Sequence, residues 1–159
     1  MEFNGLPLHP LIVHVVVVFA PLASVGGILY AAVPKWRWWL RWPLVATAVV
    51  AAAAAIISVR SGQDLESQRP NLQTLPGLAT HAQRGRFLRW VLLAFLAPIA
   101  LAAWQLRGPA PLSTDGSSPA GRTGVAAWVI QALLVAGSIT VLVCVFLTGD
   151  SGARSVWGG

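Results

Sequence analysis

The sequence is short of charged side chains, and of acidic ones above all. Only 10% of its 159 residues are charged, and just 5 are Asp or Glu. A soluble domain usually carries about 25% charged residues. With 56% hydrophobic residues, the chain cannot cover a water-facing surface, which argues against a soluble globular protein. Lipid must therefore face much of the chain. The length of the chain predicts a single domain.

Cysteine and the common catalytic motifs are also scarce. The single cysteine, Cys144, lies inside an apolar run, so no intrachain disulfide can form. No Cys/His spacing typical of zinc sites is present. The sequence contains no nucleophile elbow, phosphate loop or dinucleotide fingerprint. These absences favour an accessory subunit over an enzyme acting on its own.

Four long apolar runs dominate what is present. A membrane helix needs about 20 predominantly apolar residues. The runs predict an all-α fold, an integral membrane four-helix bundle, as a single domain over residues 1–159 with both termini on the same side. The expected spans are about residues 8–33, 42–60, 81–106 and 124–148, with a flexible Gly/Pro/Ser-rich linker at 108–123. Reading along the chain, we detect no internal repeat.

The two membrane sides differ in composition. We call the side with the termini and the 61–80 connection the near side, and the opposite one the far side. The far side is rich in tryptophan, which favours the headgroup level. The expected tryptophan belt consists of Trp36, Trp38, Trp39, Trp42, Trp104 and Trp128.

The net charge of the chain is +6. The basic residues flank apolar runs and form no stripe, so we expect lipid headgroups and no nucleic acid as partners.

The first apolar run also resembles a signal peptide in its position. It has no basic n-region before it, and Glu2 is acidic. We therefore expect a retained span rather than a cleaved leader.

The three histidines are the candidate functional residues. His9 and His14 lie in residues 8–14, LHPLIVH, where the first run begins, and His81 opens the third span on the same near side. A spacing of five residues turns two helical side chains about 140° apart, so His9 and His14 cannot clamp one metal from a regular helix. Ionisable groups at membrane depth usually mark a site, so each histidine is expected to find a partner on another helix.

Three interpretations of these histidines follow. In the first, His14 and His81 are the axial pair of a b-type haem between two helices, with His9 as a further ligand or an orienting neighbour. In the second, His9, His14, His81 and Asp150 bind copper or zinc. In the third, the protein is a non-catalytic scaffold of a membrane complex. His14 then bonds across helices, His9 marks a helix start and His81 lies in water.

The opening motif resembles the signature of a bacterial membrane family known as domain of unknown function 2231 (DUF2231). Other segments are similar to the same family, and together they cover nearly the whole chain. These segments are Ser61-Gly62 with Leu65-Glu66, the start of the third span at His81-Ala82, and the tail from Gly149 to Trp157.

The resemblance implies four helices with a histidine cluster near one face of the bacterial cytoplasmic (inner) membrane. Members accompany redox modules such as Rieske-type domains, which implies electron transfer with other membrane redox subunits. A homo-oligomer is a further possible assembly. Family tails often carry a histidine where this chain has Asp150. If that family histidine is a ligand, this protein either uses the Asp150 carboxylate in its place or has lost the ligand at this position. Either case favours a mixed-ligand metal site over haem.

Overall fold

The computed structural model describes residues 2–3, 6–69, 71, 77–106 and 124–157. Two short strands form an antiparallel pair at the N-terminus and are followed by helices. The strands are β1 (Glu2–Phe3) and β2 (Leu6–Pro7), and the helices are α1 (Leu8–Ala32), the 3-10 turn η1 (Pro34–Trp36), α2 (Arg37–Gln68), α3 (Leu78–Gln105) and α4 (Val125–Trp157).

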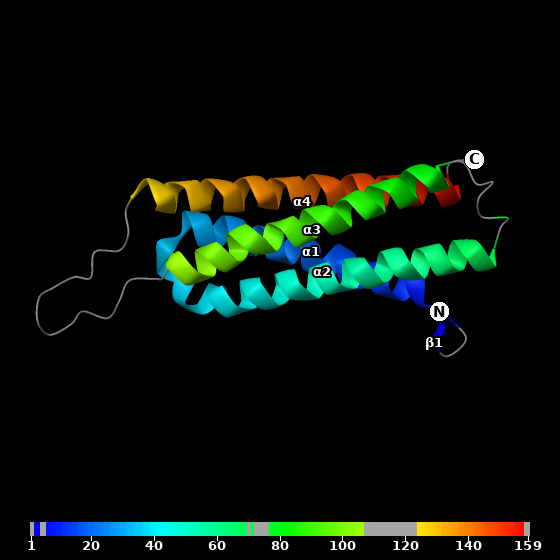
Figure 1. Cartoon of the computed structure of the whole chain (residues 1–159), viewed down its shortest axis with the longest axis horizontal. Helices are drawn as coiled ribbons and strands as arrows, with labels where there is room; N and C mark the ends of the chain where they lie inside the picture. The colour runs from blue at the N-terminus through cyan, green and yellow to red at the C-terminus, as the bar shows by residue number, and fades with distance from the viewer. Residues whose placement is uncertain (1, 4–5, 70, 72–76, 107–123, 158–159) are drawn as a thin grey trace, which may run out of the picture.

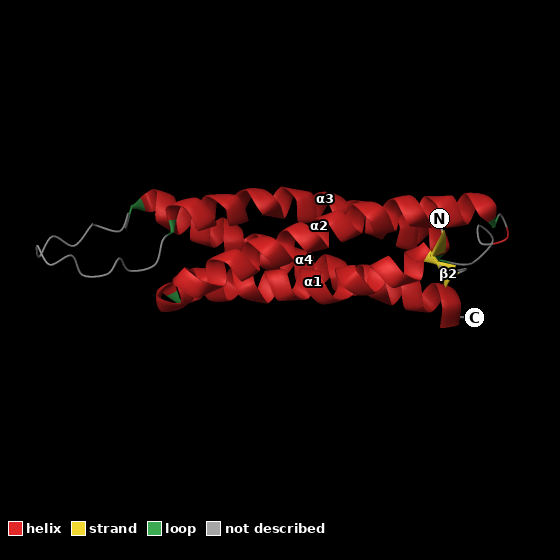
Figure 2. Ribbon diagram, turned by 90° about the horizontal axis from the view of Figure 1, so that it is seen from below, coloured by secondary structure: helices red, strands yellow, loops and turns green. Residues whose placement is uncertain are grey.

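The four α-helices lie side by side in an elongated bundle (Figures 1 and 2). Helix α1 packs against α2 and α4, and α3 packs against the same two helices, so α1 and α3 face each other across the bundle. All four are long and apolar enough to cross a membrane. Both chain ends lie at one end of the bundle (Figure 1), which confirms the predicted architecture.

Two of the helices are longer than the predicted spans. Helix α2 runs to Gln68 and α4 runs to Trp157, whereas the apolar runs predicted ends near 60 and 148. Apolar composition marks only the part of a helix that lies in lipid, and both helices continue beyond it. Helix α3 begins at Leu78, directly after Gly77, which has a left-handed φ of 83°. The predicted linker at 108–123 lies outside the described residues.

Small residues bring the helices close together at mid-bundle. A Cβ on Gly27 of α1 would lie 2.6 Å from Ser138 Oγ of α4, and one on Gly137 of α4 would lie 2.6 Å from Phe95 Cδ2 of α3. Four alanines in the range 51–55 of α2 are also buried. Small side chains allow close backbone approach, which supports helix association in lipid.

Two side chains satisfy helix ends on the far side. Arg37 donates from Nε to Tyr30 O at 2.9 Å and from Nη2 to Ala31 O at 3.1 Å. The Tyr30 hydroxyl donates to Leu106 O at 2.7 Å. The last carbonyls of a helix have no partner within it. These bonds therefore give partners to carbonyls at the far-side ends of α1 and α3.

The exposed apolar surface locates the membrane boundaries. On α2 the exposed large apolar side chains extend from Trp38 to Ile57, and on α4 from Val125 to Leu147. Each interval is about 30 Å of helix, the thickness of a bilayer's hydrocarbon core. All six tryptophans of the expected far-side belt are exposed. The residues that follow Ile57 and Leu147 therefore lie at the near-side membrane boundary.

Candidate functional site: a cavity between two oriented histidines

His9 docks onto α2 at the near-side boundary. It lies in the first turn of α1, and its Nδ1 is 2.9 Å from the carbonyl oxygen of Ser58. Ser61 Oγ donates to the same oxygen at 3.1 Å. A Cβ on Gly62 would lie 3.0 Å from the His9 Cε1. The ring therefore reaches the α2 backbone because residue 62 has no side chain.

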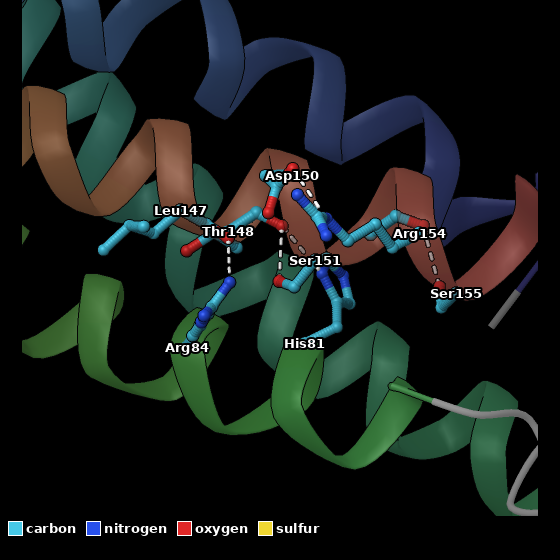
Figure 3. Close-up of polar contacts among 9 residues, drawn as sticks. His81, Arg84, Leu147, Thr148, Asp150, Ser151, Arg154 and Ser155 are labelled. Carbon is cyan, nitrogen blue, oxygen red and sulfur yellow. Dashed lines mark hydrogen bonds and ion pairs between the residues drawn. The ribbon is translucent and has the colours of Figure 1, made fainter. Parts of the chain in front are cut away.

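His81 docks onto α4 in the same manner. Its Nδ1 is 3.0 Å from the carbonyl oxygen of Thr148, to which Ser151 Oγ also donates at 2.9 Å (Figure 3). A Cβ on Gly152 would lie 2.9 Å from the His81 Cε1. Arg84, one turn along α3, donates to the preceding α4 carbonyl, that of Leu147, at 2.7 Å.

The two histidine contacts are the same arrangement built twice. In each, a first-turn histidine bonds the first carbonyl of a five-residue segment whose fourth residue is serine and whose fifth is glycine. The segments are SVRSG at 58–62 and TGDSG at 148–152. Our reading along the chain missed this repeat, because the shared pattern is short and follows two spans of otherwise different sequence.

The hydrogen bonds fix which nitrogen of each ring is available. A carbonyl oxygen only accepts, so Nδ1 of His9 and of His81 carries the hydrogen, and Nε2 of the neutral ring keeps its lone pair. Among the described residues, no protein group is hydrogen-bonded to either Nε2. Histidines that bind metals almost always donate their other N–H in this way, which orients the ring.

A cavity of about 160 Å³ is lined by both histidines. All four helices contribute to it. Its membrane-side wall is aliphatic apart from Arg86 of α3, whereas Gln63 and Glu66 of α2 line it on the water side of Gly62. The aliphatic wall consists of Val13, Val16, Val17, Ala55, Leu88 and Val145.

The structure does not bring His14 to this cavity. Its side chain is exposed on α1, and its Nδ1 is 2.6 Å from the carbonyl oxygen of Pro10 on the same helix. We expected lipid to turn His14 inward and pair it with His81. With an angle of about 140° between them, only one of His9 and His14 can face the bundle, and His9 does. A bond to its own helix satisfies His14 instead.

Asp150 also stands apart. Its Oδ1 forms an ion pair with Nε of Arg154, on its own helix, at 3.0 Å (Figure 3). Within the part of the chain that the structure describes, no group of three or more His, Cys, Asp or Glu side chains is gathered to hold a metal ion. The four predicted metal ligands, His9, His14, His81 and Asp150, are therefore not assembled as a set.

The four long apolar helices define a four-span helical membrane protein. The chain belongs to the DUF2231 family of predicted membrane proteins, whose family model matches residues 5–159. This confirms the family to which the opening motif pointed. Neither the curated proteins nor the solved structures that were searched contain a match to the chain.

Proposed function

We propose that the protein is a small membrane redox subunit that binds its cofactor in the near-side cavity through Nε2 of His9 and His81. One observation carries the proposal: both rings are oriented by a bond from Nδ1 to a helix carbonyl, and both line one cavity. Neutral imidazole with its second nitrogen held in this way is a common ligand arrangement for iron, copper and zinc.

The two imidazoles, which come from facing helices, would supply two nitrogen ligands to the iron of a b-type haem, the group that would carry the electron. The structure favours His9 rather than His14 as the partner of His81. A copper or zinc site is less favoured, because protein zinc sites use three or four ligands. Glu66 also lines the cavity, but among the described residues no three His, Cys, Asp or Glu side chains are gathered to hold a metal ion.

The test is whether a redox-active molecule co-purifies with the protein. The full chain is purified in mild detergent, its visible spectrum is recorded, and an organic extract and a metal analysis are made. We expect close to one bound haem or organic redox molecule per chain. His9→Ala and His81→Ala should each lose most of it, whereas the matched control His14→Ala should keep it.

The result that contradicts the proposal is equally specific. If the wild-type chain is folded by circular dichroism and elutes as a single species but carries no redox-active molecule and binds neither haem nor a quinone or quinol that is added, the histidines serve only in packing. The scaffold interpretation then stands in place of the proposal.

A further inference from the structure

We infer that the molecule bound in the near-side cavity is a lipid-soluble hydroquinone, whose ring lies between His9 and His81. This inference rests on the proposed function and names the class of its cofactor. Four features carry it: the size of the cavity, the distribution of polar groups in it, the nitrogen that carries the hydrogen in each of its two imidazoles, and the depth of the cavity in the membrane.

The cavity has the size of a single ring. Its volume of about 160 Å³ is close to that of an engineered cavity of about 150 Å³ that binds benzene. Pockets for drug-sized ligands span about 300–1,000 Å³. One six-membered ring fits this volume, whereas a porphyrin is considerably larger and would extend beyond it.

The polar groups lie where the ring hydroxyls of such a molecule would be. Both Nε2 atoms are hydrogen-bond acceptors, because each Nδ1 already donates to a carbonyl. A hydroquinone has two hydroxyl groups to donate. The oxidised quinone has only carbonyl oxygens, which accept and cannot pair with these nitrogens. Two further donor side chains that line the cavity, those of Gln63 and Arg86, are exposed, so we take the two imidazoles to set a preference for the reduced form.

The depth of the cavity fits a molecule with an apolar tail. The histidines lie just beyond Ile57 and Leu147, where the exposed apolar surface of α2 and α4 ends. Below them the wall is aliphatic apart from Arg86, and one of its aliphatic members, Val17, is 49% exposed on the lipid-facing surface. A ring at the level of the histidines can thus extend its tail past Val17 into lipid.

The inference is tested by measuring the binding of a decyl-tailed benzoquinol and of the matching benzoquinone. The full chain is used in quinone-free detergent micelles at about pH 8, where an ordinary imidazole is neutral. We expect the quinol to bind about tenfold or more tightly than the quinone, since two hydrogen bonds are made by one form only. Equal affinity for the two forms overturns the inference.

Variants separate the site from the fold. His9→Ala and His81→Ala should each weaken quinol binding about fivefold or more, and His14→Ala should leave it unchanged. Gly85→Leu keeps both histidines and fills the cavity: Gly85 lines it, and a Cβ there meets nothing within 4 Å. Because leucine is a better helix former than glycine, this variant should fold and fail to bind. Full binding by Gly85→Leu contradicts the inference.

The possible failures remain distinguishable. Purified protein that carries haem on both histidines overturns the hydroquinone and keeps the proposed redox function. A chain that carries no haem and binds neither quinol nor quinone overturns both.

Discussion

At the scale of single residues, the site depends on the second nitrogen of each imidazole. A helix carbonyl holds Nδ1–H of His9 and of His81, and a serine hydroxyl shares each carbonyl. These bonds set the ring orientation before any ligand arrives. Orientation of this kind lowers the conformational entropy lost on binding.

The choice between His9 and His14 could not be predicted from the sequence. The motif showed that the two rings point to different sides of α1, but both positions belong to an apolar helix with no polar face to indicate the interior. The choice depends on Gly62, which leaves room for the His9 ring. That contact joins residues more than fifty positions apart and appears only in three dimensions.

A residue-scale prediction concerns the far-side hydroxyl of Tyr30. It is buried and donates to Leu106 O, so it links two helices. Tyr30→Phe should lower the free energy of unfolding by about 1 kcal/mol, measured by reversible unfolding in mixed micelles of SDS and a mild detergent. Thr140→Val is the control, because that exposed hydroxyl bonds only Ala136 O of its own helix. If both variants lose equal stability, the interhelical bond has no special role.

At the scale of helices, the sequence predicted the number and nature of the elements but not their ends. The apolar runs located four spans because lipid requires them. The near-side turns of α2 and α4 are helical for a different reason. They form the surfaces on which the histidines dock, and Ser61 and Ser151 are buried there at 2% and 5% exposure. Hydropathy does not record such packing.

The repeated docking arrangement gives a prediction for glycine. Gly152→Ala places a Cβ 2.9 Å from the His81 ring, whereas a Cβ on Gly149 meets nothing within 4 Å. Alanine favours a helix over glycine by about 0.5–1 kcal/mol, so Gly149→Ala should be neutral or stabilising. Gly152→Ala should be about 1–3 kcal/mol less stable than that control, by the same unfolding measurement.

The corresponding substitution where His9 docks onto α2, Gly62→Ala, should have a similar effect. A Cβ on Gly62 would meet the His9 ring at 3.0 Å, so Gly62→Ala should destabilise the protein to a similar extent and weaken cofactor binding. A loss from only one of the two glycine variants would show that the two docking sites are not equivalent.

At the scale of the whole molecule, the bundle holds its site at one membrane boundary. The far end carries the six tryptophans of the belt and the bonds of Arg37 and Tyr30 to helix-end carbonyls. The near end carries both termini (Figure 1) and the paired histidines. A cofactor in this position is reached from the lipid and, beside Gln63 and Glu66, from the near-side water.

This arrangement predicts which positions label together in sealed vesicles of uniform orientation. In a Cys144→Ala background, Gln68→Cys and Arg154→Cys should react with a membrane-impermeant maleimide from one side, and Lys35→Cys from the other. All three native side chains are exposed, so none of the substitutions disturbs packing. Labelling of Lys35→Cys and Arg154→Cys from the same side would exclude the four-span topology.

The most direct test of the central claim is ¹⁵N NMR of the histidine rings, during titration with the molecule that co-purifies or with the benzoquinol. We predict that His9 and His81 carry hydrogen on Nδ1, and that both Nε2 resonances shift together while that of His14 does not. Hydrogen on Nε2 of either docked ring, or a shift of only one of them, would contradict a shared site.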